Sequence, residues 1–432
     1  MTHLRLHRAR ARRATLSIAL VAVAPLGAQQ PASTGPITRA GALSLALASG
    51  GRAAIAGATA RIAAGNLLAA RALTNPAISA SRSTSFPEYH AAVDIPLDFL
   101  TIRSLRIAAA TSANEAARLR LAFETAAVRV TVDTLYTRAV ASAARAGLSH
   151  RNAVAAESLL AVARVRRDAG DASDLDVELA VVNAGQAEIA SASDSLGGIG
   201  ALLDLQATLG VASREPVIAL ADSVLIPSPD SLSRLAAAAE SAVEAIARAG
   251  AMPLNVAASE RDLRAAEQAL ALERRSVWSG FAVSAGGEWR DPGQPGFLPT
   301  IGISIPLPLF NRHQGEIAVA AATRDRARAE LALARVEGAT AIAQARRQLQ
   351  VAVVRAQRDR DLVASADRVA RMSLQAYAEG AYPLTSVLEA QRNARETLAQ
   401  YIADVAAVHI AAATLRLYAF GGDEPLPSTP NR

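Results

Sequence analysis

The sequence predicts a mainly α-helical protein with some β-structure. Two tandem repeats are expected, each with a β-hairpin and a long antiparallel pair of coiled-coil helices. Three observations predict this fold: residues 210 positions apart match, two pairs of short segments alternate between apolar and polar residues, and long stretches lack proline. Alanine is abundant and aromatic residues make up only 3% of the chain, a composition that suits closely packed helices.

The N-terminus is typical of a secretory signal peptide over residues 1–28. Five arginines precede an apolar stretch from Ala14 to Ala24, and a small residue, Ala28, marks the expected cleavage position. We expect general secretion, because the residues after Arg13 are a poor continuation of a twin-arginine signal. The alternative is an uncleaved anchor, but the apolar core is too short to cross a bilayer.

Charge and cysteine content narrow the function classes. The formal net charge is +6, but five of the arginines lie in the signal peptide. The mature chain is therefore close to neutral, which argues against a nucleic-acid partner. The chain has no cysteine, so packing or assembly must hold it together. Charged residues interrupt every apolar run after the signal, and we expect no further transmembrane helix.

A constant offset of 210 residues relates the two halves of the chain. Ile95–Leu97 falls on Ile305–Leu307, and Gly170 falls on Gly380 without a gap. Two copies of one supersecondary unit explain this register. The predicted organisation is a signal peptide over 1–28, a first repeat over 36–215, a connecting equatorial segment with a short helix over 216–250, a second repeat over 251–420 and a disordered tail over 421–432.

Each repeat holds, after an initial helix, a predicted β-hairpin, at about 76–99 and about 281–309. Apolar residues such as Val93 and Ile95 alternate with polar or small ones, and turn residues separate the paired segments. Segments of about ten residues fit tilted strands that cross a bilayer. Aromatic residues that could form a girdle lie near the loop ends: Phe86, Tyr89, Trp289 and Phe297.

A helical hairpin follows each β-hairpin, with its tip near residue 170 or 380. No proline interrupts 97–215 or 309–382, and a helix over 316–377 is about 90 Å long at about 1.5 Å per residue. The returning helices carry the 4-3 spacing of a coiled-coil seam. The predicted seam of the second repeat is Val387, Gln391, Ala394, Leu398, Tyr401, Val405, Val408, Ala412 and Leu415. That of the first is Leu175, Leu179, Val182, Gln186, Ile189, Ser193, Leu196, Gly200 and Leu203.

Four strands per chain predict an oligomer. Four strands cannot close a barrel, and open sheet edges do not survive in lipid. Three copies would supply a trimeric 12-stranded transmembrane barrel, and the helices would prolong it as a periplasmic tube. The alternative is a periplasmic coiled-coil protein that never enters the membrane, such as an adaptor or a surface-fibre subunit. That alternative explains the helices and the signal but not the two hairpins.

Motifs at one strand-to-helix junction and at both helical tips carry a family resemblance. They are Ile-Pro-Leu-Pro-Leu-Phe-Asn-Arg-His-Gln-Gly-Glu-Ile at 305–317, Tyr377-x-x-Gly380 with 386–391, and Gly170 with 175–177. The chain from about 37 to 420 thereby resembles the TolC family of outer-membrane efflux proteins. It is most similar to the branch that serves metal-cation efflux pumps.

The resemblance implies a channel in the outer membrane of a Gram-negative-type cell, with a large periplasmic portion. The implied assembly is a homotrimer in outer-membrane lipid. Its implied partners are a periplasmic adaptor (membrane fusion) protein and an inner-membrane pump of the resistance-nodulation-division or a similar class. The implied cargo is small molecules or metal cations, with protein secretion as the alternative. The sequence lacks phosphate-binding loops, nucleophile elbows and metal-ligand spacings, so we predict no enzyme, no cofactor and no bound metal.

The resemblance also places a candidate periplasmic aperture at the tips. Its residues are Asp174, Asp176, Tyr377, Ser386 and Glu389, with Gly170 and Gly380 as tip turns. Threefold rings of carboxylates at a constriction would favour cations. Ser386 stands where the family has an aspartate, which weakens the ring. The alternative is that the acidic residues are solvated groups at a helix start, where they favour the helix dipole.

Overall fold

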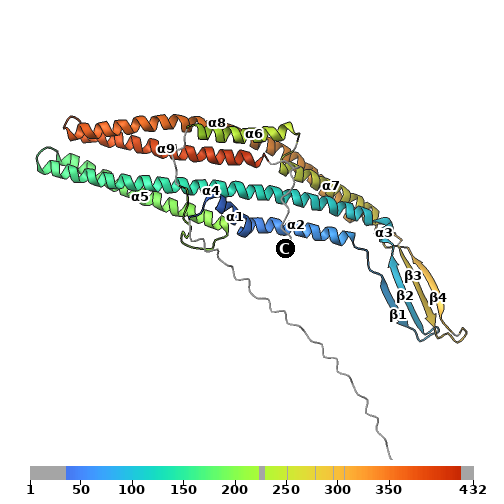
Figure 1. The fold of residues 1–432 in the computed structure, drawn as a ribbon. Helices are drawn as coiled ribbons and strands as arrows, with labels where there is room; N and C mark the ends of the chain where they lie inside the picture. Colours follow the sequence, from blue (N-terminus) through green and yellow to red (C-terminus); the bar gives the residue numbers. More distant parts are fainter. Residues whose placement is uncertain are drawn as a thin grey trace, which may run out of the picture. The chain divides into compact units, whose positions relative to one another are not determined.

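A computed structural model describes residues 36–222, 229–250, 252–277, 279–294, 296–305 and 307–419. The predicted signal peptide and tail lie outside these residues. The elements in chain order are α1 (Arg39–Ser49), α2 (Gly51–Arg71), β1 (Ala77–Arg82), β2 (Tyr89–Pro96), α3 (Asp98–Thr101), α4 (Arg103–Asp168), α5 (Asp174–Leu209), α6 (Pro229–Arg248), α7 (Leu254–Ser276), β3 (Ala282–Trp289), β4 (Leu298–Ser304), α8 (Gln314–Ala378) and α9 (Leu384–Leu417) (Figure 1).

The two predicted β-hairpins are confirmed, and together they form one antiparallel sheet. The strand order is β1-β2-β3-β4, so β2 and β3 join the two repeats. In the register, Val93 lies opposite Ala285, and Ala285 lies opposite Ile301. Among the described residues, β1 and β4 each have a strand on one side only. The sheet therefore ends in two open edges.

Apolar residues follow one face of the sheet without any cover from the described part of the chain. Ile78, Ile301 and Ile303 are 80%, 82% and 71% exposed. The opposite face carries small and polar residues, and His90 and Glu288 form an ion pair there with 3.1 Å between Nδ1 and Oε1. An apolar face bare of protein is the pattern of a strand surface that faces lipid.

The repeat is exact in the long helices. The first helical hairpin ends its outgoing helix at Asp168 and starts its return at Asp174, and the second does so at Ala378 and Leu384. Each pair of positions differs by 210 residues, as the sequence predicts. Helix α4 packs against α5 and α9, and α9 packs against α8. The four helices thus lie in the order α5, α4, α9 and α8 (Figure 1).

The core lies along the helix contacts, and it confirms only one of the two predicted seams. On α9, Tyr401, Val405 and Val408 are buried against α6 and α8. On α5, the predicted seam is wrong within the chain, because Leu175, Val182, Ile189 and Leu196 are 55–71% exposed. Helix α5 instead packs on α4 through the buried residues Val177, Ala180, Ala187, Gly198, Leu205 and Leu209.

The connecting segment contains more helix than the sequence analysis expects. Helix α6 has 20 residues and a strong separation of apolar and polar faces. Its Leu232, Ala239 and Val243 are buried against α8 and α9. Among the residues that the structure describes, the helices α2 and α9 are long and apolar enough to cross a membrane by length and composition alone. Since half of the apolar stretch in α9 is buried inside the chain, that helix is a core helix here.

Candidate functional site

Each helical hairpin turns through a glycine in the left-handed conformation. Gly170 has φ +83° and Gly380 has φ +76°, values that residues with a Cβ rarely adopt. One hydrogen bond past each glycine closes the turn: Asp171 donates to the Arg166 carbonyl over 2.8 Å, and Ala381 donates to the Ala376 carbonyl over 2.8 Å. This pattern is a helix C-cap of the Schellman type. The two glycines therefore allow the tight turn at each tip.

At the first tip, one candidate carboxylate has a local partner and the other does not take part in the cap. Ser173 and Asp176 form a capping box, in which the Asp176 carboxylate accepts from the Ser173 N–H over 3.1 Å and from its hydroxyl over 2.9 Å. Capping accounts for Asp176 without any role in a pore. Asp174 lies in the first turn of α5 with its side chain exposed to solvent.

The second tip lacks this arrangement. Pro383 occupies the N-cap of α9 and makes no side-chain cap bond. Leu384 and Ser386 stand 210 residues after Asp174 and Asp176, so neither acidic group recurs. Ser386 is half-buried, and Glu389 is exposed one turn further along the helix. Asp174 and Glu389 are therefore the two candidate carboxylates that are both exposed and outside the cap.

Tyr377 joins the two tips to each other. It is 6% exposed, within a cluster formed by Leu159, Ala163, Val177 and Ala180 of the first hairpin and Leu384 and Val387 of the second. The Arg166 guanidinium of α4 lies 4.6 Å from the centre of its ring, and Arg166 Nη1 donates to the Tyr377 carbonyl over 2.8 Å. The Tyr377 hydroxyl is buried without a hydrogen-bond partner among the described residues. The site therefore includes Arg166, which sequence reasoning missed.

A pair of carboxylic acids lies between α8 and α9. Asp404 is 6% exposed and accepts from Gln400 Nε2 over 3.0 Å. Burial and the neighbouring Asp404 carboxylate raise the pKa of Asp359 to about 6, against the lowering effect of Arg355 and Arg358. Two like charges in contact cannot both ionise easily, so the pair holds a proton at a pH where an isolated aspartate does not.

Metal-binding geometry does not appear in the described part of the chain. No group of three or more His, Cys, Asp or Glu side chains is arranged to hold an ion there. His313, at the strand-to-helix junction, lies 3.9 Å from a Glu273 carboxylate oxygen. It occupies the N-cap of α8 with φ 56°, and its side chain makes no cap bond. Asn311 Oδ1 accepts from its N–H over 2.9 Å, which accounts for the turn locally.

Comparisons with known proteins agree with this geometry. Residues 284–419 match the model of the outer membrane efflux protein family. The cobalt-zinc-cadmium resistance protein CzcC of Cupriavidus metallidurans is 29% identical over 289 residues, which is 66% of this chain and 66% of the relative.

Two solved structures share the fold. The CmeC outer membrane channel of Campylobacter jejuni has a TM-score of 0.70 with 12% identity, over 90% of this chain and 87% of that one. The outer membrane protein VceC of Vibrio cholerae has a TM-score of 0.67 with 16% identity, over 89% and 97%. At these identities the likeness establishes the fold of the described chain.

Proposed function

We propose that this chain is an outer-membrane efflux protein of the TolC family and the exit channel of a tripartite efflux system, because residues 284–419 match the outer membrane efflux protein family and the Cupriavidus relative CzcC is 29% identical. The observation that carries this proposal is the open four-stranded sheet with a bare apolar face. Its strands continue into helices of 66 and 65 residues, each about 100 Å long at about 1.5 Å per residue. A membrane sheet joined to such helices forms a duct from the outer membrane into the periplasm.

The functional unit is a homotrimer. The edges β1 and β4 expose unpaired backbone groups, which lipid does not satisfy. Pairing β4 of one copy with β1 of the next closes a barrel of twelve strands from three four-stranded sheets. The helices support the same arrangement, because α5 and α8 lie at the two ends of the helix row. Both present exposed apolar residues: Leu175, Val182, Ile189 and Leu196 on α5, and Val351, Leu362, Val369 and Met372 on α8.

The tips are the periplasmic entrance, where a periplasmic adaptor and an inner-membrane pump dock. Exposed Asp174 and Glu389 lie at this end, and threefold symmetry makes each into a ring of three carboxylates. Such rings favour cations over anions. The name of the Cupriavidus relative refers to resistance to cobalt, zinc and cadmium, so divalent metal cations are the cargo we propose first. Other small molecules are the alternative cargo.

Native mass spectrometry of the mature chain, extracted from outer membranes, tests the assembly. We expect a trimer that gives a low resting conductance in planar bilayers. Replacing Asp174→Asn together with Glu389→Gln should lower the preference for cations over anions. Glu157→Gln, an exposed carboxylate on α4, is the matched control and should leave the preference unchanged. A water-soluble monomer or fibre without conductance contradicts the channel and supports the coiled-coil alternative.

A further inference from the structure

The free end of the sheet brings an aromatic pair and an arginine together on one face. Arg82 of β1 lies opposite Tyr89 of β2, and Tyr89 lies opposite Trp289 of β3. Directly opposed residues in neighbouring strands point to the same face. Since Tyr89 precedes Ala91 and Val93 on alternate positions, this is the apolar face of the sheet. The Tyr89 and Trp289 rings stack there, 5.8 Å apart and 11° from parallel.

Two guanidinium groups lie against the same tyrosine ring. The Cζ atom of Arg82 is 5.5 Å from the centre of the Tyr89 ring, and that of Arg290 is 5.6 Å from it. Both distances are within the range of a cation–π contact. The two cations therefore stand close to one aromatic surface, at the end of the face that is otherwise apolar.

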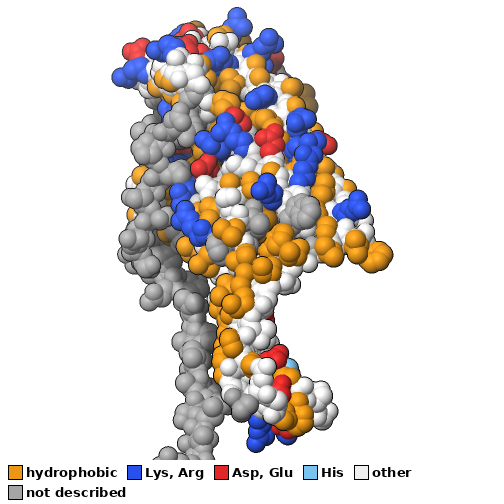
Figure 2. Space-filling model, turned by 90° about the vertical axis from the view of Figure 1, so that its right-hand side faces the viewer, with side chains coloured by type: hydrophobic (Ala, Val, Ile, Leu, Met, Phe, Trp, Pro, Cys, Tyr) orange, Lys and Arg blue, Asp and Glu red, His pale blue; other side chains and the backbone are white. Residues whose placement is uncertain are grey.

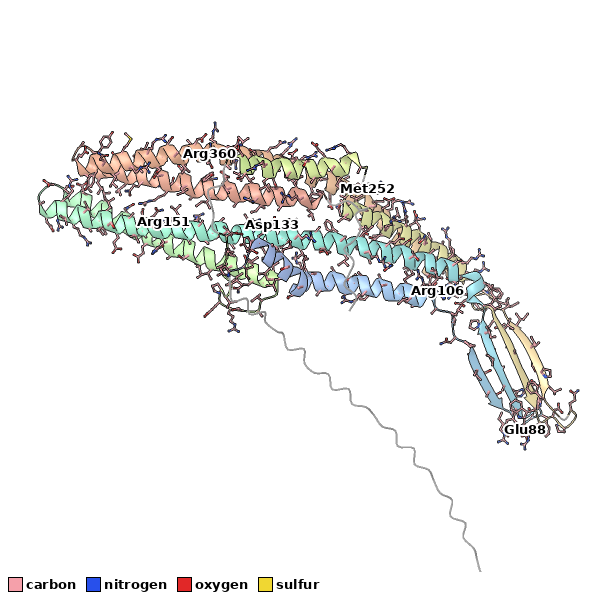
Figure 3. The ribbon with its side chains drawn as sticks, viewed as in Figure 1. Glu88, Arg106, Asp133, Arg151, Met252 and Arg360 are labelled. Atoms are coloured by element: carbon pink, nitrogen blue, oxygen red, sulfur yellow. The ribbon has the colours of Figure 1, made fainter. Side chains whose placement is uncertain are left out.

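The backbone places Arg290 there. A residue directly after Trp289 in a regular strand would point to the polar face, but Arg290 has φ 65°, in the left-handed region. Its Nη1 atom also pairs with Glu88 over 3.1 Å, while its side chain remains 65% exposed. Glu88 lies at the loop end of the sheet, at the opposite end from Arg106 (Figure 3). The turn thus holds a solvated guanidinium in place.

Arg82 has no such partner. It is exposed, and it forms no ion pair with a carboxylate among the residues that the structure describes. Figure 2 shows arginine, acidic and hydrophobic side chains gathered at the free end of the sheet. One unpaired cation, one oriented cation and a stacked aromatic pair thus meet where the apolar face ends.

We propose that Arg82 and Arg290 bind the phosphate of a membrane-lipid headgroup in the outer leaflet, with Tyr89 and Trp289 at the boundary of its acyl region. This inference rests on the proposed function, since it needs the apolar face to lie in a bilayer. Helices leave the sheet at its other end, so the loop end faces away from the periplasm. Arginine donates paired hydrogen bonds to phosphate, and tyrosine and tryptophan favour the membrane interface.

Lipid titration of the detergent-purified assembly, followed by native mass spectrometry, tests the proposal. The probes are a bisphosphorylated glycolipid and the same glycolipid without phosphate. With the phosphorylated probe, we expect the variant Arg82→Gln with Arg290→Gln to bind about tenfold more weakly or worse, because each cation near an anionic lipid contributes to binding. The unphosphorylated probe should bind both proteins equally. Arg214→Gln, an exposed arginine in the loop after α5, is the matched control and should bind like the unchanged protein.

The same spectra separate this inference from the proposed function. If the unchanged protein does not form a trimer, the proposed function is overturned. An intact trimer whose double variant keeps the phosphorylated lipid as well as the unchanged protein would overturn the headgroup site alone. The lipid assignment would be overturned if millimolar inorganic phosphate displaced the lipid and the double variant bound the lipid and inorganic phosphate more weakly to the same degree. That result would indicate a site for soluble anions.

Discussion

The two helical hairpins share one length and one turn but use their apolar residues differently. In the second, α9 buries most residues of its 4-3 seam, and Val408 and Leu415 are fully buried. In the first, α5 carries an equally regular row, Leu175, Val182, Ile189 and Leu196, that no part of the described chain covers. Helix α5 contacts α4 through smaller residues such as Ala180 and Ala187.

The difference follows from what surrounds each hairpin. The α8–α9 hairpin carries α6 as an extra layer, whose Leu232 and Val243 complete its core. In the α4–α5 hairpin, α2, α7 and α9 pack against α4, whereas α5 is covered by α1 near its base, where Ala42 and Ala46 are buried. A seam pattern predicts that an apolar face exists. The helices that pack on that face decide whether it becomes part of the core or stays free as an interface between copies.

The largest expected effect is a core substitution in α9. Leu415→Ala should lower the free energy of unfolding by about 2–5 kcal/mol, because it leaves a cavity in a packed site. The matched substitution on the other hairpin, Leu196→Ala, removes the same atoms from a side chain that is 70% exposed. Its effect on melting, followed by circular dichroism in detergent, should depend on protein concentration. If both substitutions lowered the free energy of unfolding equally and independently of protein concentration, the distinction between the two seams would disappear.

The row on α5 can be tested directly through assembly. Val182→Glu with Ile189→Glu should weaken trimer association by tenfold or more, equivalent to about 1.4 kcal/mol, because buried unpaired carboxylates are costly at an interface. Native mass spectrometry at decreasing protein concentration measures the change. The control is Val154→Glu, which adds a charge at an exposed apolar position on α4. A trimer that survives the α5 changes unaltered would place this row outside the subunit interface.

Local features were predictable because each depends on neighbouring residues. Gly170 and Gly380 marked the turns, since a tight turn after a helix needs a left-handed residue. Alternation at Val93 and Ile95 predicted the hairpins, because a strand's period of two shows in any short segment. The repeat then placed corresponding ends of the long helices 210 residues apart.

Non-local contacts were not predictable in the same way. The sequence did not predict that the Tyr377 ring lies against Arg166, which is 211 positions earlier in the chain. No rule of sequence spacing predicts a spatial contact between residues so far apart. The α5 seam failed for the same reason, because its 4-3 pattern contains no information about which helix lies beside it.

The contact between the hairpins at the tips gives a third prediction. Arg166→Gln should remove the contact with the Tyr377 ring and weaken the hydrogen bond to its carbonyl, at a cost of about 1–2 kcal/mol. Because this contact ties the two tips together, the resting conductance in planar bilayers should rise several-fold. Arg164→Gln, an exposed arginine on the same helix, is the control. Unchanged conductance in Arg166→Gln would show that the tips stay joined by the apolar cluster alone.

The smallest effect concerns the acidic pair in the second hairpin, for which the first has no counterpart at the equivalent positions, Ser149 and Asp194. The pKa of Asp359 is raised to about 6 by burial and by Asp404. In the unfolded chain an aspartate loses its proton near pH 4. Between about pH 4 and pH 6 the folded chain therefore holds more protons, and its stability falls as the pH rises through that window.

After allowance for the solvent exposure of Asp359, this change is about 1 kcal/mol or less. Urea unfolding at pH 4, 5, 6 and 7 measures it, and Asp359→Asn should flatten the decline because the asparagine cannot lose a proton. Asp361→Asn, whose carboxylate is 76% exposed, should keep the decline. A decline that persists unchanged in Asp359→Asn would assign it to other groups, and the two hairpins would then differ in packing but not in their response to pH.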